Sequence, residues 1–197
     1  MIGFYTKNFG GVWFGVACTE QHVYGTSFAS TEREAFRSLL VGLPFEASFQ
    51  VFSEPSTFAN EVLAAVKNVF YGKGVSQSFP LATEHLTSYT RKVLAAASLI
   101  PVGYVASYGA IAKAAGGSPR AVGNVMASNP FAPFVPCHRI VSSDFGLGGY
   151  GGGLRVKHEF LVREKRGYAA PKEIPAGDRK LQVFPVEFVL NKIRKKR

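Results

Sequence analysis

The run from Pro136 to Ile140 reads Pro-Cys-His-Arg-Ile and places a thiol beside an imidazole and a guanidinium. A cysteine attacks electrophiles as its thiolate, and a neighbouring histidine or a positive local field favours that form. Free cysteines are more often small buried hydrophobic residues. Because His138 and Arg139 come immediately after Cys137, we favour a nucleophilic role for this cysteine over a role in packing.

Other residues near this run support the same interpretation. Asn129-Pro130 lies shortly upstream, and the glycine-rich stretch 146–153 lies just downstream. Glu164 offers a carboxylate that could orient His138. Together these features predict an active site around Cys137.

Composition limits where such a site would operate. With 197 residues, 47% of them hydrophobic, the chain can bury the core of one large or two small domains. No apolar run approaches the roughly 20 residues of a membrane span, and the N-terminus lacks a signal-peptide pattern. A disulfide between the two cysteines would remove the nucleophile, so we expect reduced thiols. We therefore expect a cytoplasmic protein without membrane contact, associated with the nucleoid, or nuclear if the source is eukaryotic.

We expect neither a metal nor another cofactor. With Cys137 reserved for chemistry, the other candidate ligands are too scattered to make a recognisable zinc spacing. These are Cys18, His22, His85 and His158.

Charge is distributed unevenly along the chain. Residues 1–90 hold 5 Lys or Arg and 7 Asp or Glu, for a net charge of −2. Residues 91–166 hold 10 Lys or Arg and 3 Asp or Glu, for a net charge of +7. Residues 167–197 hold 8 Lys or Arg and 3 Asp or Glu, for a net charge of +5. A basic second part indicates either a polyanionic partner or a solvated basic surface, and charge alone does not separate the two.

The first 80 residues have the pattern of an α/β domain. Short β-like runs at 11–17 and 22–28 predict a hairpin, and 47–52 predicts a third strand. A helix should begin after Thr31, and apolar residues at helical spacing predict a second helix over 58–71. Residues 75–81 have the pattern of a linker, and we expect the aromatic residues of this part to form its core.

The second part has a mainly helical pattern. A helix is predicted over 83–98, and Ser107 is a candidate N-cap for a short helix over 108–115. After the turn at Gly116-Gly117, Ser118-Pro119 starts another helix that runs to residue 127. Two short helices joined by a tight turn have the form of a helix-turn-helix, although many such pairs bind nothing.

Several ordered motifs over about residues 83–166 resemble the O6-alkylguanine-DNA alkyltransferase family, also called methylated-DNA–protein-cysteine methyltransferases. The motifs are Val105 to Ala112, Pro119 to Met126, Asn129-Pro130, Val135 to Val141, and Gly149 to Leu154 with Lys157. The resemblance implies a two-domain architecture. Its parts are an α/β N-terminal domain at 1–80, expected to have a structural role, and a mainly α C-terminal domain at 81–166 that contains the helix-turn-helix and would bind DNA and carry out the catalysis. Residues 167–197 form a basic extension beyond the family's core.

The resemblance implies DNA repair by direct reversal of damage. Cys137 would take the alkyl group from O6 of guanine irreversibly, so that each protein acts once. His138 would be the base, directly or through a water, and Glu164 would hold its tautomer. Asn129 would brace the turn that carries the thiol, and Tyr108 would donate a hydrogen bond toward the purine. The residues implied to contact the base, besides Tyr108, are Met126, Val135, Ile140, Tyr150, Gly151 and Gly152.

The implied partner is double-stranded DNA that contains O6-alkylguanine, bound by a monomer. The target atom is inside the duplex, so the nucleotide must be rotated out. Arg120 would fill the vacated stack, or it would make an ordinary phosphate contact. The residues implied to face the minor groove are Ala121, Gly123 and Asn124. Candidates for phosphate contacts are Lys92, Lys113 and Arg155.

Three positions depart from the family's pattern. Ile140 replaces a valine, Gly151 stands where many relatives have serine, and Ala132 stands where some have proline. The basic end 189–197 could add nonspecific DNA affinity or be a solvated end. One alternative function is a noncatalytic lesion sensor on the same fold, although relatives of that kind lack the cysteine that this chain keeps. Another is a DNA-binding regulator with a redox-reactive Cys137.

Overall fold

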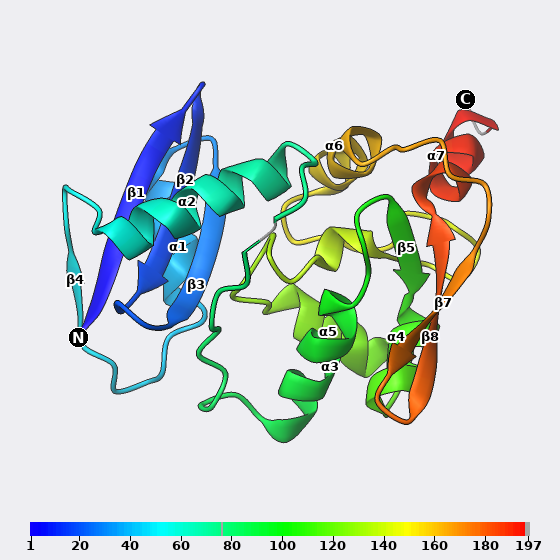
Figure 1. Ribbon diagram of the computed structural model, residues 1–197, viewed down its shortest axis with the longest axis horizontal. Coiled ribbons are helices and arrows are strands. Elements are labelled where there is room, and N and C mark those ends of the chain that lie inside the picture. The colour runs from blue at the N-terminus through cyan, green and yellow to red at the C-terminus, as the bar shows by residue number, and fades with distance from the viewer. Residues whose placement is uncertain (76, 196–197) are drawn as a thin grey trace. The chain divides into compact units, whose positions relative to one another are not determined.

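The computed structural model describes residues 1–75 and 77–195 (Figure 1). The chain forms two compact units and passes between them more than once. The first unit comprises Met1–Phe70, Gly74–Leu86 and Ser128–Phe134. The second comprises Tyr71–Lys73, Thr87–Ala127 and the chain from Val135 onward.

The first unit is built on a sheet with strand order β3-β2-β1-β4. Its strands are β1 (Ile2–Phe9), β2 (Val12–Cys18), β3 (Val23–Ala29) and β4 (Phe49–Val51). The first three are antiparallel neighbours, and β4 pairs in parallel with β1. The predicted hairpin is the β2–β3 pair. Strand β1 was not predicted, and it turns into β2 through Gly10-Gly11, both at positive φ, as a tight two-residue hairpin requires.

Helices α1 (Glu32–Leu40) and α2 (Thr57–Phe70) cover opposite faces of this sheet (Figure 1). Successive strand residues point to opposite faces. The Phe14 ring meets Phe70 of α2 at 5.4 Å, whereas the neighbouring Gly15 lies against Leu39 of α1. Thr31 caps α1 by accepting a hydrogen bond from the Glu34 amide, so the helix starts where the sequence predicts.

The second unit combines helices with a small mixed sheet of order β6-β5-β8-β7. Its strands are β5 (Tyr104–Ser107), β6 (Ile140–Val141), β7 (Lys172–Ala176) and β8 (Arg179–Pro185). Its helices are α3 (Ser88–Ser98), α4 (Tyr108–Ala115), α5 (Pro119–Ala127), α6 (Leu154–Arg163) and α7 (Val186–Lys195), with a single 3-10 turn η1 at Cys137–Arg139. Ser107 caps α4 through the Ala110 amide, and α4 and α5 form the expected helix-turn-helix. The expected fold class, an α/β unit with a mainly helical second unit, is confirmed.

Two boundaries differ from the sequence prediction. The helix predicted from residue 83 begins at Ser88, because the Thr87 hydroxyl caps it and a turn from Thr83 to Leu86 precedes it. At the end of the predicted linker, the Pro80 carbonyl accepts from the Val23 amide and the Ala82 amide donates to the Val23 carbonyl, each at 2.8 Å. That segment therefore extends the edge of the first unit's sheet.

The C-terminal residues are not a separate, solvated extension. Strand β8 pairs with β5, where Val105 faces Phe184 across the ladder. Apolar residues alternate along β8 and recur along α7, and those that are fully buried join the core of the second unit. They are Leu181, Val183, Val186 and Val189. Of the basic end at 189–197, residues 196 and 197 lie outside the described residues.

Within residues 1–75 and 77–195, none of the helices combines the length and the apolar character needed to cross a membrane.

Candidate active site

The second unit contains a cavity of about 720 Å³ that opens beside the thiol of Cys137. Helices α4 and α5, the turn η1 and the loop after β6 supply its walls. Sequence reasoning named seven of its lining residues: Tyr108, Arg120, Gly123, Met126, Cys137, Tyr150 and Gly151. The others are Gly109, Pro119, Ala127, Ser142, Ser143 and Gly149.

The turn η1 fixes the position of the thiol. The amide of Cys137 donates to the carbonyl of Val135 at 2.8 Å, and the amide of Arg139 donates to that of Pro136 at 2.9 Å. Cys137 is only 7% exposed, so a reactant reaches it through the cavity. The backbone that carries the thiol is therefore held in place, and the thiol can be reached by a ligand from the cavity.

Two phenols flank the thiol. Burial raises the pKa of Tyr150 well above its ordinary value, and the charge and hydrogen bond of Cys137 add to the effect. Burial and the nearby Cys137 also raise the pKa of Tyr108. The Tyr108 hydroxyl donates a hydrogen bond to the Gly149 carbonyl at 3.1 Å. Both hydroxyls remain protonated at neutral pH and can act as hydrogen-bond donors.

Lys157 is a buried cation at the same site. Its Nζ donates to the carbonyls of Ile140, at 2.5 Å, and Gly149, at 3.0 Å. Burial lowers the pKa of Lys157 to about 8, while the charge of Cys137 acts to raise it. The ammonium lies 5.8 Å from the Tyr108 ring centre and 5.9 Å from that of Tyr150. A positive charge therefore lies close to the position where a thiolate would form.

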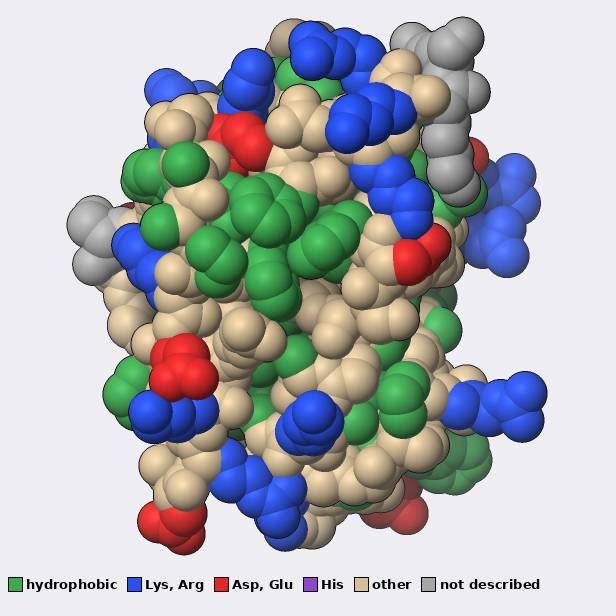
Figure 2. Space-filling model, turned by 90° about the vertical axis from the view of Figure 1, so that its right-hand side faces the viewer, with side chains coloured by type: hydrophobic (Ala, Val, Ile, Leu, Met, Phe, Trp, Pro, Cys, Tyr) green, Lys and Arg blue, Asp and Glu red, His purple; other side chains and the backbone are tan. Residues whose placement is uncertain are grey.

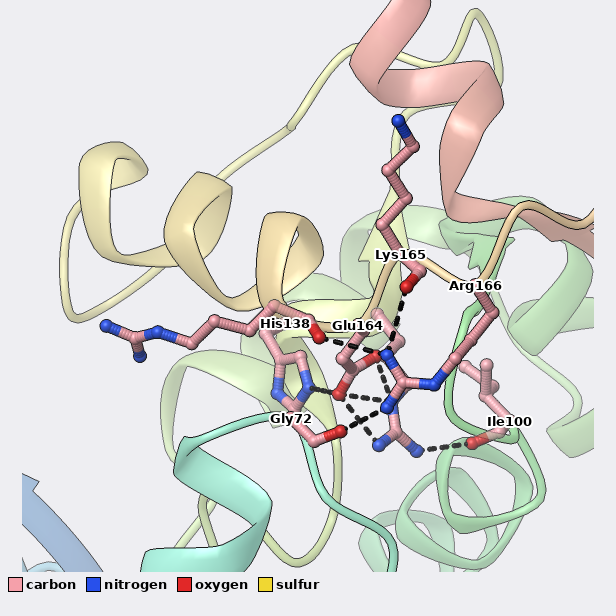
Figure 3. Close-up of polar contacts among 8 residues, drawn as sticks. Gly72, Ile100, His138, Glu164, Lys165 and Arg166 are labelled. Carbon is pink, nitrogen blue, oxygen red and sulfur yellow. Dashed lines mark hydrogen bonds and ion pairs between the residues drawn. The ribbon is translucent and has the colours of Figure 1, made fainter.

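Next to the thiol in sequence, His138 and Arg139 form a buried cluster with Glu164 that is joined by hydrogen bonds; Figure 3 shows His138 pointing toward Glu164. His138 Nε2 lies 2.9 Å from Glu164 Oε1. The guanidinium of Arg139 binds both oxygens of Glu164 at 2.9–3.1 Å and donates to the Ile100 carbonyl at 2.6 Å. Glu164 thus accepts from a cation and an imidazole at once.

This cluster sets the protonation state of each member. Burial alone would raise the pKa of Glu164, but the hydrogen bonds and charges of His138 and Arg139 outweigh it and lower that pKa to about 2. Burial lowers the pKa of His138; the hydrogen bond and charge of Glu164 only partly offset this, and the charges of Arg139 and Lys157 lower the pKa further. His138 is therefore neutral at pH 7.

A neutral His138 that donates from Nε2 to Glu164 keeps a lone pair on Nδ1. Nδ1 is buried and has no hydrogen-bond partner among the described residues. The ring is held flat against Phe160, with centroids 4.3 Å apart. The imidazole thus has the tautomer and the fixed orientation of a general base.

The end of α6 that carries Glu164 is also anchored. Arg166 donates to the carbonyls of Arg163 and Lys165, each at 3.0 Å, and to that of Gly72 (Figure 3). These bonds satisfy carbonyls at the helix end and hold residues 71–73 to it.

Four other residues named from the sequence do not line the cavity. Val135 and Ile140 are fully buried, and they and Gly152 are not among the lining residues. Asn129 lies in the first unit, where its side chain accepts from the Phe131 amide at 3.0 Å. Its support of the Cys137 turn stays a prediction.

The proposed DNA contacts lie mostly on the surface of the second unit. Arg120 is exposed at the start of α5, Asn124 is exposed one turn later, and Ala121 is half-buried. Lys92, Lys113 and Arg155 are exposed on α3, α4 and α6, and Arg155 pairs with Glu159 at 3.2 Å.

Sequence reasoning assigned no role to two charged residues of the site. Arg139 was considered only for its charge, and Lys157 only as part of a motif. A signal for Lys157 is present, because it lies one turn before Phe160 and Leu161 on the face of α6 that is otherwise apolar.

The comparisons with known proteins agree with this geometry. Residues 88–166 match the family model described as 6-O-methylguanine DNA methyltransferase, DNA binding domain. A methylated-DNA–protein-cysteine methyltransferase of Methanothermobacter thermautotrophicus is 44% identical over 78 residues, which are 40% of this chain and 44% of that protein. One from Archaeoglobus fulgidus is 36% identical over 109 residues, which are 55% of this chain and 73% of that protein.

Solved structures extend the likeness to both units. The O6-methylguanine-DNA methyltransferase of Pyrococcus kodakaraensis matches with a TM-score of 0.63 and 31% identity, over 83% of this chain and 99% of that one. Mycobacterium tuberculosis OGT in complex with DNA matches with a TM-score of 0.64 and 25% identity, over 83% and 92%. The chain spans less than half of the Methanothermobacter protein, but it covers most of the Archaeoglobus protein and nearly all of the Pyrococcus structure. The chain therefore belongs to the methylated-DNA–protein-cysteine methyltransferase family.

Proposed function

We propose that this protein repairs DNA by moving an alkyl group from O6 of guanine to the sulfur of Cys137. The observation that carries the proposal is the thiol at a 720 Å³ cavity, with a phenol and an ammonium beside it. The buried cluster of His138, Arg139 and Glu164 adjoins it. The names of the relatives support the same reaction.

The reaction is an in-line displacement at carbon. His138 Nδ1 takes the thiol proton, directly or through a water, and the sulfur attacks the alkyl carbon. A carbon–sulfur bond forms, the carbon–O6 bond breaks, and its electron pair stays on the guanine. The product is a thioether, which no group in the cavity can cleave. Each protein molecule is therefore consumed by one transfer.

The charged groups lower the barrier by stabilising both ions that form when the thiol proton moves to His138. Lys157 stabilises the thiolate, and Glu164 stabilises the imidazolium that forms when His138 accepts the proton. Tyr108 and Tyr150 can donate hydrogen bonds to the purine as negative charge develops on it. Tyr108 donates to the Gly149 carbonyl when no substrate is bound, so this bond exchanges for one to the base.

Access to O6 requires the nucleotide to leave the duplex, which costs a few kcal/mol. The cavity lies beside the helix-turn-helix, because both α4 and α5 supply its walls. Arg120 lines the cavity and is exposed at the start of α5, where it can occupy the gap in the base stack. Small residues of α5 allow a close approach to the minor groove, and phosphate contacts come from Lys92, Lys113 and Arg155.

The proposed partner is double-stranded DNA that carries O6-alkylguanine, bound by one protein molecule. Damage can occur at any guanine, so binding should depend on salt and little on sequence.

A restriction-site assay tests the proposal. An O6-methylguanine placed in a cleavage site blocks cutting, and repair restores it. We expect the restored fraction to plateau at one site per protein molecule, however long the incubation. Cys137→Ala should restore none, whereas Cys18→Ala, at the buried thiol of the first unit, should match the wild type. Tight lesion binding without restored cleavage would instead indicate the lesion sensor.

A further inference from the structure

The loop between β6 and α6, at residues 142–153, forms one wall of the cavity. Ser142, Ser143, Gly149, Tyr150 and Gly151 all line it. The loop also packs on Tyr108. A side chain at Gly148 would bring its β-carbon to 2.9 Å from the Tyr108 ring, and the Gly149 carbonyl accepts the Tyr108 hydroxyl. The position of this loop therefore fixes that of a phenol beside the thiol.

The loop contains a turn in which one residue has a backbone conformation that is unusual for its type. The Ser142 amide donates to the Gly146 carbonyl at 2.9 Å, and the Gly146 amide donates to the Asp144 carboxylate at 3.0 Å. Between them Phe145 has φ = +61°, a conformation that residues other than glycine rarely adopt. Such a residue keeps that conformation only where its surroundings fix it.

Those surroundings come from the C-terminal segment, residues 179–195. The Phe145 ring meets Phe184 of β8 at 5.0 Å and Phe188 of α7 at 5.3 Å, both edge-on. Lys192 of α7 donates to the carboxylate of Asp144 at 2.5 Å and also to its main-chain carbonyl. Two consecutive residues of the loop are thus held by three residues about 40 positions later.

The C-terminal segment is itself firmly placed. Val186 and Val189 of α7 are fully buried with Val105, Val141 and Leu161, and Phe145 and Leu147 of the loop pack against the same cluster. Figure 2 shows the face that carries β7, β8 and α7, where hydrophobic side chains gather near the centre with Lys and Arg side chains around them. The segment lies beyond residues 88–166, the part that the family model matches.

We propose that residues 179–195 are a brace that holds the loop 142–149 and, through it, Tyr108, and so limits the size of the alkyl group that the cavity admits. The claim about size rests on the proposed function, whereas the claim about loop position does not. Phe188 and Lys192 are positioning residues, because they act through the loop and do not line the cavity.

Hydrogen exchange tests the brace without any reaction. In Lys192→Met and in Phe188→Ala, amides of residues 142–149 should exchange at least about tenfold faster than in the wild type. Peptides from α5 should be unchanged. Lys192→Arg, which keeps the charge, should restore most of the protection, and Lys195→Met, an exposed lysine of the same helix, is the matched control. Unchanged loop exchange in both variants would overturn the proposal.

Rates on two substrates test the claim about size. We expect the ratio of single-turnover rates, O6-benzylguanine DNA over O6-methylguanine DNA, to rise at least about threefold in Lys192→Met and Phe188→Ala. If the two residues had only a structural role, both rates would fall by the same factor. That result would overturn the claim about size, and so would faster hydrogen exchange with an unchanged ratio of rates. If the wild type transfers neither group, the proposed function fails, and hydrogen exchange still decides whether the brace exists.

Discussion

The two cysteines of the chain are both buried but have different charged neighbours, and this difference supports Cys137 as the proposed nucleophile. Burial, with Glu20 nearby, raises the pKa of Cys18 to about 12, so that thiol stays protonated and inert. Cys137 instead has the hydroxyl of Tyr150 and the ammonium of Lys157 in its surroundings. Both groups favour a negative sulfur.

Replacing Lys157 should therefore slow the transfer. A preorganised charge beside a developing anion contributes about 10²-fold to a rate, so we expect Lys157→Met to lower the single-turnover rate by about that factor. Lys165→Met, at an exposed lysine just after the same helix, is the control. Equal rates in the two variants, with both folded by circular dichroism, would show that Lys157 acts only in packing.

The cluster around Glu164 predicts how stability depends on pH. Glu164 has a pKa of about 2 when folded and 4.5 as its ordinary value, so the unfolded chain binds its proton more readily. Its contribution is fully present above pH 4.5 and is lost as pH falls toward 2, by on the order of 3 kcal/mol.

Urea unfolding between pH 5 and pH 2.5 measures this dependence. Glu159→Gln, on the same helix but at an exposed position, should keep the full acid dependence of the wild type. Glu164→Gln should lose the part that Glu164 contributes, and it should be less stable at pH 7 because Arg139 is left buried without its carboxylate. The same acid dependence in both variants would contradict the assignment of charges in the cluster.

At the scale of elements, the helix-turn-helix and the cavity share residues. Arg120 and Gly123 belong to α5 and line the cavity, while Tyr108 and Gly109 come from the first turn of α4. A base that enters the cavity therefore passes the start of α5. The helices proposed to bind DNA are therefore the same pair that supplies walls of the cavity.

The place of Arg120 at the start of α5 predicts that it contributes to the reaction with duplex DNA and contributes little to the alkyl-transfer step. Arg120→Ala should lower the repair rate of duplex DNA about tenfold, since it removes the side chain that fills the base stack. Its reaction with free O6-benzylguanine, which needs no base rotation, should stay close to that of the wild type. An equal loss in both reactions would mean that Arg120 acts on the transfer step itself.

At the scale of the molecule, the chain contributes to two units in alternating segments, and its C-terminal part completes the second. The fully buried Val186 and Val189 of α7 share a core cluster with Val105 and Leu161, and Phe184 of β8 packs against it. Leu181 and Val183 of β8 are also fully buried. The residues beyond the family model are thus part of the fold that carries the site.

A matched pair of leucines tests this placement. Leu181 of β8 is fully buried, and Leu154 at the start of α6 is half exposed. We expect Leu181→Ala to lower the free energy of unfolding by about 3 kcal/mol, and Leu154→Ala by less than about 1 kcal/mol. Similar values for the two variants in urea unfolding would mean that β8 does not belong to the core.

The sequence was sufficient to predict the motif-bearing parts of the second unit. The caps at Thr31 and Ser107 and the turn at Gly116-Gly117 act locally, so short-range rules identify them. The partnership of His138 with Glu164 was suggested by the residues around Cys137 and again by the family resemblance.

Long-range contacts account for what the sequence did not predict. The bonds of Arg139 to Glu164 join positions 25 residues apart, and the pairing of β5 with β8 joins positions about 80 apart. For the basic end 189–197 the sequence left two alternatives open, added DNA affinity or a solvated end, because the apolar face of α7 is spaced among lysines and arginines. Over residues 189–195 the buried Val189 and the partly buried Leu190 and Ile193 place the helix against the core.

The most direct measurement is the intact mass of the protein after incubation with duplex DNA that holds one O6-methylguanine, followed by peptide mapping. The predicted result is a gain of one methylene group, about 14 Da, that plateaus at one per molecule and maps to Cys137. Unchanged mass at full occupancy of the lesion, or a methyl group on any other residue, would contradict Cys137 as the acceptor.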